Sequence, residues 1–436
     1  MALSTLSLAD APPDGFSFVK ESGGIEAYEL EANGLQVLFM PERTAPVAAF
    51  MVTYHVGSRN EGPGLTGATH MLEHLMFKGT ERFNKRAGTS IFNTLQQVGA
   101  RVNASTWLDR TNYYELLPVE HLPLAMEVEA DRMRGALLDP QDVASERSVI
   151  LNEFDRGENE PIRALYHALW ATAFLAHPYR HPTIGWRSDI ETITPDDLRG
   201  FYDTFYWPNN ATVSIVGDVD RAAVLTAVQR HFGSIPASPD PIPEVTTREP
   251  EQEGERRLEL RRPGQAGVVL AGYKAPDASH QDSDALDVLA SVLAMGNGSR
   301  LYRALVDKGL AAGVSAGAPR LRNPGLFYIL ALLAPETDGP DIEAVLHEEI
   351  ARLQDEGITA GELRRAVNQL KAQEAFGRDG PYSIVAQLNE AIAAGDWTLY
   401  TEYMERIEAV TPADVQRVAQ TYLRRAGRTV GHYIPS

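Results

Sequence analysis

Apolar residues recur along the chain with two different periods. In LPLAMEVEADRMRGALL (122–138) and PADVQRVAQTYLRR (412–425) they fall three and four residues apart, as on one face of an amphipathic helix. Shorter runs rich in β-branched and aromatic residues are typical of strands, as in FMVTY (50–54), ATVSIVGDV (211–219) and RTVGHYI (428–434). Long helices combined with antiparallel-looking strands predict an α+β protein.

This pattern occurs twice. IETITPDDLRGFY (190–202) matches IEAVTPADVQRVA (407–419), and both copies contain Thr-Pro-x-Asp, which is typical of a helix start with Thr as the N-cap. The strand-like runs at 50–54 and 267–271 are separated by the same 217 residues that separate the starts of the first pair. We therefore predict an internal duplication, with chance recurrence of a short capping motif as the alternative.

A candidate linker, GSIPASPDPIPEVTTREPEQEGER (233–256), separates the two copies. It contains five prolines and a cluster of glutamates, and no apolar periodicity continues across it. We predict two homologous α/β-sandwich-like domains, residues 1–232 and 257–436, joined by this linker. A chain of 436 residues is also longer than one hydrophobic core usually serves.

Composition excludes several classes of function. The net charge of −19 argues against a nucleic-acid partner, because such proteins present a basic surface to the phosphates. The chain has no cysteine, which excludes disulfides and Cys-ligated metals. Its apolar runs are shorter than the roughly 18 residues that span a membrane. The start, MALSTLSLADAPPDG, lacks the basic and apolar regions of a signal peptide, although a processed form would look the same.

The sequence HMLEH (70–74) is the first candidate for chemistry. On a helix, His70 and His74 share one face, and imidazole nitrogen is a preferred zinc ligand. Between them, Glu73 is placed to take a proton from a water molecule. The preceding loop offers Thr66 as a possible N-cap of this helix. The alternative is that two histidines lie one helical turn apart by accident.

A third ligand is expected on another helix. In SERSVILNEFDRGENEP (145–161), Glu146 and Glu153 are seven residues apart and therefore share a helix face. Spacing does not decide between these two carboxylates, and Glu158 is a weaker candidate. The alternative for this segment is an ordinary solvated acidic face.

HMLEH resembles the inverted zinc motif H-x-x-E-H of the pitrilysin/insulinase superfamily. In that family the third ligand is a Glu in a stretch like VILNE, and Glu153 matches it, 79 residues after His74. The resemblance implies a Zn²⁺ ion on His70, His74 and Glu153, with Glu73 as the catalytic base. It also implies that Glu146 supports a zinc-binding histidine.

The resemblance extends to VNASTWLDRTNYYELLP (102–118). In the family, this stretch provides an edge strand along which an extended peptide pairs through its backbone. It implies that Asn103 and Ala104 bind the substrate. An ordinary strand with a polar edge is the alternative.

One segment departs from the family pattern. Complete members provide an Arg and a Tyr from this segment, which stabilise the developing oxyanion. In SRLYRALVDKGLAAGVSAG (299–317), Val306 and Ala312 occupy those positions, while Tyr302 and Arg303 are displaced from them. The resemblance therefore implies a heterodimer with a related subunit that lacks the zinc motif and supplies the Arg/Tyr pair, a division of labour related to that in mitochondrial processing peptidase and in two-subunit bacterial enzymes.

We expect a zinc-dependent endopeptidase subunit that hydrolyses peptides or small unfolded proteins. The alternatives are a non-catalytic structural subunit, like the core proteins of respiratory complexes, and a self-sufficient homodimeric peptidase. Bacterial relatives of the two-subunit type are often exported, so we expect the periplasm, with the cytoplasm as the alternative.

Overall fold

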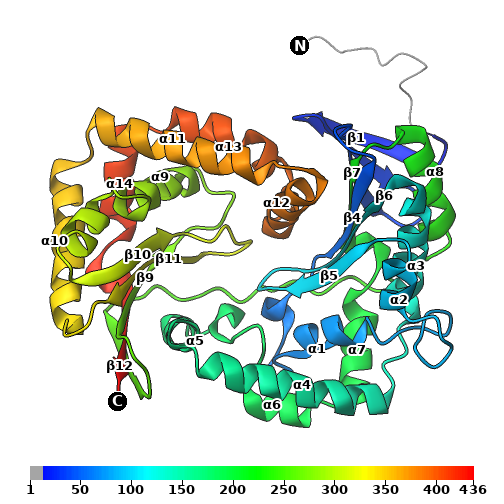
Figure 1. Cartoon of the computed structure of the whole chain (residues 1–436), viewed down its shortest axis with the longest axis horizontal. Coiled ribbons are helices and arrows are strands. Elements are labelled where there is room, and N and C mark those ends of the chain that lie inside the picture. Colours follow the sequence, from blue (N-terminus) through cyan, green and yellow to red (C-terminus); the bar gives the residue numbers. More distant parts are fainter. Residues whose placement is uncertain (1–12) are drawn as a thin grey trace.

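The computed structural model describes residues 13–436 and contains two β-sheets with helices packed around them (Figure 1). Most of the N-terminal stretch considered above for a signal peptide lies outside the described residues. In the part that is described, every helix is too short or too polar to cross a membrane.

The first sheet has seven strands in the order β1-β2-β3-β7-β4-β6-β5. Only β3 and β7 pair in parallel, and all other neighbours are antiparallel. The strands are β1 (Phe16–Ser22), β2 (Ile25–Leu30), β3 (Leu35–Pro41), β4 (Val47–Tyr54), β5 (Arg101–Thr106), β6 (Thr111–Pro118) and β7 (Ala211–Gly217). The central strand β7 is buried along its whole length, whereas β5 forms an outer edge.

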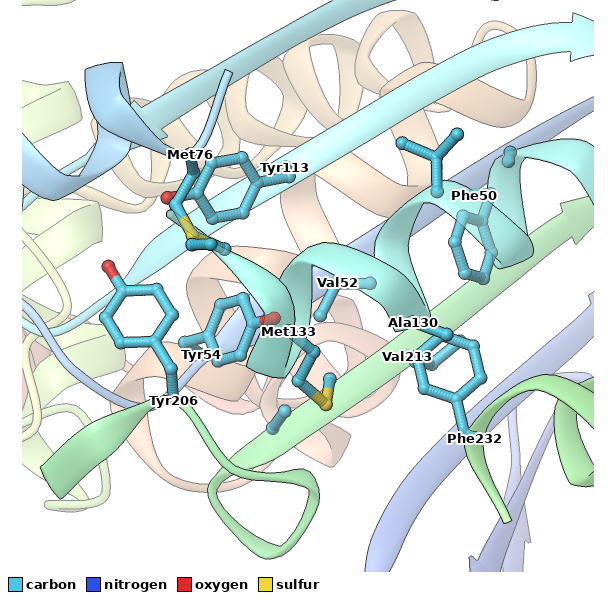
Figure 2. Packing of buried hydrophobic residues seen from close by; sticks show 14 of the residues in the cluster. Phe50, Val52, Tyr54, Met76, Tyr113, Ala130, Met133, Tyr206, Val213 and Phe232 are labelled. Carbon is cyan, nitrogen blue, oxygen red and sulfur yellow. The ribbon is translucent and has the colours of Figure 1, made fainter. Parts of the chain in front are cut away.

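Helices from the same half of the chain cover one face of this sheet. They are α1 (Ala68–Leu75), α2 (Ile91–Gln96), α3 (Leu122–Gly135), α4 (Pro140–Glu158), α6 (Arg187–Thr192), α7 (Pro195–Phe205) and α8 (Arg221–Phe232). Helix α5 (Pro161–Ala173), from the same half, packs against the second sheet instead. Phe50 and Val52 on β4 pack with Met133 on α3 and Phe232 on α8 in one core cluster (Figure 2). Burial of these large apolar side chains, each contributing about 1.5–3 kcal/mol, holds the helices on the sheet.

The second sheet repeats the topology of the first. Its order, β10-β11-β9-β12-β8, corresponds to β5-β6-β4-β7-β3 and includes one parallel pair, β12 with β8. The elements are β8 (Arg256–Arg262), β9 (Val268–Ala275), α9 (Asp282–Ala294), β10 (Ala311–Gly317), β11 (Gly325–Leu333), α10 (Gly339–Glu356), α11 (Ala360–Gly377), α12 (Pro381–Ala394), α13 (Thr398–Ala409), α14 (Pro412–Tyr422) and β12 (Arg428–Pro435). This repetition confirms the predicted duplication and the α+β class.

The repeated Thr-Pro-x-Asp motifs also behave as predicted. Thr194 and Asp197 form a capping box at the start of α7, and Thr411 and Asp414 form the same box at the start of α14. In each, the Thr hydroxyl accepts a hydrogen bond from a backbone N–H and the Asp carboxylate accepts one in return, which satisfies donors that the first turn leaves free.

One helix from each half of the chain packs against the sheet of the other half. Helix α5 packs against β8, β9 and β12, where Leu165 and Leu169 contact the backbone at two glycines of those strands. In the same way α12 packs against β4 and β7, with Val385 and Leu388 in one cluster with Met51. The two domains are thus tied together by apolar packing that their order in the sequence does not reveal.

The described chain forms no helix or strand between Phe232 and Arg256, yet this stretch is well anchored. The Glu249 carboxylate accepts hydrogen bonds from the three consecutive backbone N–H groups of residues 175–177. The Gln252 amide donates to the Arg428 carbonyl, 2.7 Å away. The stretch therefore follows the surface along a fixed path, and the proposed domain boundaries at 232 and 257 stay a prediction.

Candidate metal centre and peptide cleft

Helix α1 begins at a point that only glycine fits. The N-cap, Gly67, has a φ of 90°, and a Cβ atom added there would lie 2.5 Å from the Ile184 carbonyl oxygen. The Glu61 carboxylate accepts hydrogen bonds from the backbone N–H groups of Gly67 and Thr69, each 2.8 Å long. A buried acid six residues upstream therefore caps the helix that carries HMLEH, and it also suits the positive end of the helix dipole.

The expectation that Thr66 caps this helix is wrong. Its hydroxyl donates to Asp189 Oδ2 at 2.7 Å and accepts from the Trp186 backbone N–H at 2.9 Å. Thr66 therefore fixes the preceding loop to α6. The residue that caps the helix, Glu61, lies six residues before Gly67, which is too far for a local capping pattern to predict it.

The structure brings His70, His74 and Glu153 together. One potential ligand atom from each lies within 4.8 Å of the others, and in the described part of the chain this is the only such group of three. The His70 Nε2 atom is 3.7 Å from Glu153 Oε2, and the two imidazole rings lie with their centroids 4.8 Å apart. Two imidazoles and a carboxylate form the ligand set of catalytic zinc sites.

Burial keeps His70 in the form that a metal requires. Desolvation, together with the nearby His74, lowers the pKa of His70 to about 4, although the Glu153 carboxylate acts in the opposite direction. The imidazole is therefore neutral at neutral pH. Its Nδ1 atom is buried without a hydrogen-bond partner among residues 13–436, and Nε2 faces Glu153.

Glu146 orients the second histidine. Its Oε2 atom is 2.9 Å from His74 Nδ1, which leaves His74 Nε2 for a metal, and its other oxygen pairs with Lys78. The hydrogen bond with His74 is the main reason why the pKa of the Glu146 carboxyl is lowered. For His74, burial lowers the pKa, but the hydrogen bond to Glu146 and three nearby carboxylates raise it above its ordinary value.

Glu73 lies beside the three ligands, on the same helix. Its Oε2 atom accepts a hydrogen bond of 2.7 Å from the Thr106 hydroxyl at the end of β5. Burial raises the pKa of Glu73 above its ordinary value, while the bond from Thr106 opposes this shift. The carboxylate is thus held on one oxygen and keeps the other available to accept a proton.

A cleft of about 1130 Å³ opens beside these residues. All its lining residues lie between Glu73 and Glu146, and they include the stacked rings of Phe77 and Phe92, 4.6 Å apart. Asn103 lines the cleft from β5, and Ala104 is its neighbour on the same edge strand. Edge strands offer unpaired backbone groups to an extended peptide, and the substrate-binding role of Asn103 and Ala104 stays a prediction.

A buried charge cluster supports the cleft from below. Arg132 on α3 is fully buried and pairs with Glu129 and Glu115. Its guanidinium lies over the rings of Phe77 and Tyr113, with distances of 4.8 and 4.2 Å to the ring centroids. The sequence pattern does not reveal this cluster, because charged residues three apart on an amphipathic helix usually lie on its solvated face.

The second copy of the helix carries different chemistry. At the positions that correspond to His70, Glu73 and His74, α9 has Asp287, Ala290 and Ser291. The Asp287 carboxylate accepts hydrogen bonds of 3.1 and 2.7 Å from Arg320. The carboxylate of the second copy is therefore already engaged by the Arg320 guanidinium. Within the described residues, the metal-ligand set occurs only in the first copy.

The Arg/Tyr positions of the C-terminal half lie outside the cleft lining. Val306 ends a short π-helical turn, Tyr302–Val306, and Ala312 lies exposed on the outer strand β10. Neither side chain can donate a hydrogen bond. Within this chain, the cleft therefore offers metal ligands and a base but no oxyanion donor from that segment.

Comparison with family models assigns two adjoining regions of the chain. Residues 36–186 match the model described as insulinase (peptidase family M16), and residues 192–370 match the model described as the peptidase M16 inactive domain. The first region includes every candidate ligand, and the second includes the helix in which the ligands are replaced.

Several known proteins are similar to this chain over nearly its whole length. Zinc protease PqqE of Helicobacter pylori is 32% identical, with 90% of this chain and 89% of that protein covered. A probable mitochondrial-processing peptidase subunit beta of Arabidopsis thaliana is 27% identical, covering 90% of this chain and 75% of that protein. The crystal structure of a protease from Helicobacter pylori superposes with a TM-score of 0.90 at 30% identity, with 94% and 99% of the two chains covered.

Proposed function

The chain belongs to the insulinase (M16) peptidase family of the pitrilysin/insulinase superfamily, and on that premise we propose that it is the zinc-bearing subunit of a zinc-dependent endopeptidase. The observation that carries this proposal is the convergence of His70, His74 and Glu153 within 4.8 Å, with Glu73 on the same helix. The substrates are peptides or small unfolded proteins, because an extended backbone fits the open edge of β5.

The donor set fits zinc on chemical grounds. His70 offers a neutral imidazole, His74 keeps Nε2 available because Glu146 engages its Nδ1, and Glu153 supplies a carboxylate oxygen. A zinc ion held by these three residues would supply a Lewis acid that makes water more acidic and polarises the scissile carbonyl.

Side chains of the chain itself carry out the proton transfers and fix the orientation of the groups involved. Glu73 accepts the water proton on its free Oε1, while the Thr106 hydroxyl fixes Oε2. Glu73 then transfers this proton to the nitrogen of the departing amine, as a general base that becomes a general acid. Glu146 acts through His74 by fixing the orientation of its ring.

We further propose that the active enzyme is a heterodimer. Val306 and Ala312 cannot stabilise an oxyanion, and loss of one such donor typically costs about 10²–10³-fold in rate. A related subunit that lacks the zinc ligands but carries an Arg/Tyr pair would restore these donors. Similarity to proteins named zinc protease and mitochondrial-processing peptidase subunit beta supports the peptidase half of this proposal.

The test is hydrolysis of a quenched fluorescent peptide by wild type and by Glu73→Gln, each with and without the related subunit. The proposal predicts that wild type gains at least about 100-fold in rate with the partner and that Glu73→Gln is inactive in both conditions. Equal rates for wild type with and without the partner would instead support a self-sufficient homodimer. Full activity of Glu73→Gln would refute the mechanism.

A further inference from the structure

A groove of about 600 Å³ in the second half of the chain is strongly basic, although the chain as a whole is acidic. Five of its lining residues are arginine or lysine: Arg300, Arg303, Lys308, Arg352 and Arg365. The acidic residues of its lining are Glu349 and Glu362. Like charges repel one another, so a concentration of cations in a chain of net charge −19 indicates a site that attracts anions.

Two of these cations are already paired with the carboxylates of the groove. Arg300 donates to Glu362 through Nε and Nη2, with distances of 2.7 and 3.2 Å. The guanidinium of Arg352 lies 3.1 Å from Glu349 Oε1. These two pairs form the neutral part of the groove and leave its other cations without a counter-charge.

The other three cations, Arg303, Lys308 and Arg365, are exposed, and among residues 13–436 none of them pairs with a carboxylate. Two of their guanidinium groups flank the same turn. A Cβ atom added at Gly298 would lie 3.4 Å from Arg365 Nε and 3.9 Å from Arg303 Nη2. Positive charges this close to each other repel, and an anionic group bound at the groove would relieve that repulsion.

The available donors of the groove are side chains and not backbone groups. Thr359, at the start of α11, also lines the groove, and the N-terminus of a helix can bind phosphate through its backbone N–H groups. Here a capping box uses two such donors, because the Thr359 hydroxyl accepts from the Glu362 N–H and the Glu362 carboxylate accepts from the Thr359 N–H. Three separate charges on flexible side chains suit several carboxylates spread along an acidic protein segment.

The groove is the counterpart, in the second copy, of part of the cleft beside the candidate metal ligands. Helix α11 packs on α9 as α4 packs on α1 (Figure 1), and the N-caps of α11 and α4, Thr359 and Asp139, line their respective cavities. The segment between α9 and β10 contributes Arg303 and Lys308, as the segment between α1 and β5 contributes Asn93. Both copies therefore have a cavity at this position, but its chemistry differs between them.

The position of the groove indicates its partner. In the proposed heterodimer, the segment of the related subunit that corresponds to residues 299–312 reaches the zinc cleft of this chain. Two related subunits pack about a pseudo-twofold axis, so each contact occurs twice with the roles exchanged. Residues 299–312 of this chain then face the corresponding cleft of the related subunit, and they carry Arg303 and Lys308.

We propose that this basic groove is a docking surface for an acidic segment of the related subunit. The inference rests on the proposed heterodimeric peptidase and deepens it, since it names the surface and the charge by which the two subunits recognise each other. The attraction is electrostatic, so it accelerates association and weakens as salt screens the charges.

Association of the full-length, zinc-loaded chain with the related subunit tests the proposal. Calorimetry gives the Kd at about 50 and about 300 mM NaCl, for wild type and for the double variant Arg303→Glu/Arg365→Glu. At the lower salt concentration the double variant is expected to bind at least about tenfold more weakly, because two attractions become repulsions, and the difference should shrink at the higher one. Kd values that agree within about twofold at both salt concentrations would overturn the proposal.

The double variant Arg43→Glu/Arg230→Glu is the matched control, since it makes the same change of net charge in the first half of the chain. Both arginines are exposed, and in the described part of the chain neither pairs with a carboxylate. This control should change the Kd by less than about threefold, and circular dichroism should show that both double variants are folded. A loss as large as that of the groove variant would mean that only net charge matters and would overturn the proposal.

A fluorescent octaglutamate peptide tests the chemistry of the groove without the related subunit. It is expected to bind wild type, to bind the groove variant at least about tenfold more weakly, and to displace the related subunit. Displacement by tripolyphosphate but not by octaglutamate would overturn the proposal in favour of a small phosphate ligand. Self-association of wild type that is lost in the groove variant would overturn it in favour of a second copy of this chain.

Hydrolysis of the quenched peptide separates the two proposals. Equal stimulation of wild type and the groove variant at every concentration of the related subunit refutes the docking surface and leaves the peptidase function standing. Association that depends on the groove, without hydrolysis, refutes the peptidase function and leaves the docking surface standing. Absence of any association refutes the docking surface together with the heterodimer, and hydrolysis by the chain alone then keeps the peptidase function.

Discussion

Replacement of Glu146 by glutamine should weaken zinc binding without abolishing it. The glutamine keeps the shape of the side chain but loses the charge that faces His74 Nδ1 at 2.9 Å. A hydrogen bond that involves a charged group contributes about 1.5–3 kcal/mol, and loss of a partner behind a metal-binding histidine typically costs 10–100-fold in metal affinity, or about 1.4–2.7 kcal/mol. We therefore expect the zinc Kd of Glu146→Gln to rise by about 10–100-fold.

The assay is competition for zinc between the protein and a chromogenic chelator at pH 7.5. Lys78→Met controls for loss of the other partner of Glu146 and should change the Kd by less than about threefold, because Lys78 is 36% exposed. Glu160→Gln, just beyond the C-terminus of α4, controls for loss of one negative charge nearby. A Kd for Glu146→Gln equal to that of wild type would refute the positioning role of Glu146.

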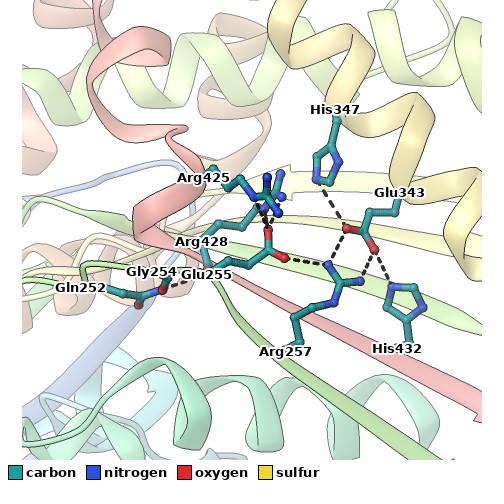
Figure 3. A network of polar contacts seen from close by, with 9 residues as sticks. All are labelled: Gln252, Gly254, Glu255, Arg257, Glu343, His347, Arg425, Arg428 and His432. Atoms are coloured by element: carbon teal, nitrogen blue, oxygen red, sulfur yellow. Dashed lines mark hydrogen bonds and ion pairs between the residues drawn. The ribbon is translucent and has the colours of Figure 1, made fainter.

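Three further substitutions test the supporting structure. Gly67→Ala should lower the free energy of unfolding by about 2 kcal/mol or more in urea denaturation, because the added Cβ meets a backbone oxygen. Gly64→Ala is the control, since Gly64 has a similar φ of 85° but open space around it, and it should cost about 1 kcal/mol or less. Arg110→Ala should cost about 1.5 kcal/mol in the same assay, since it removes the guanidinium that bonds the half-exposed Glu390 across the two halves, and an unchanged midpoint would contradict this. Glu343 contacts Arg257, His432 and His347 (Figure 3), and the hydrogen bond from Arg257 is the main cause that lowers its pKa from 4.5 to about 2. Its stabilisation, about 2 kcal/mol, should be present above about pH 4.5 and disappear as the pH falls toward 2, so Glu343→Gln should be less stable than wild type at pH 7 and equally stable near pH 2.

Local signals in the sequence predicted local structure well. The helix of His70 and His74, the two capping boxes and the helix of Glu146 and Glu153 all depend on residues within a few turns of each other. The duplication was also visible, because one offset relates elements along the two halves. The substrate role of Asn103, the domain boundaries and the periplasmic location remain predictions.

Contacts between distant segments were not predicted. Glu61 caps α1 in place of the expected Thr66, because the loop between them folds back on itself. Arg132 lies in the core beneath the cleft because Glu129 of its own helix, Glu115 and two aromatic rings surround it. Glu115 and the two rings come from other elements, and the pattern of α3 does not reveal them. The packing of α5 and α12 against the sheet of the other half could not be predicted for the same reason. The apolar residues of a helix indicate that it is buried, but they do not indicate which sheet it packs against.

The zinc content of the purified full-length chain tests the central claim most directly. Mass spectrometry of the metal should find one zinc per chain in wild type and in Glu73→Gln, and well below one in His70→Ala and in Glu153→Gln, with circular dichroism showing that all four are folded. A folded wild-type chain without zinc, or a Glu153→Gln chain that retains one full equivalent, would contradict the account.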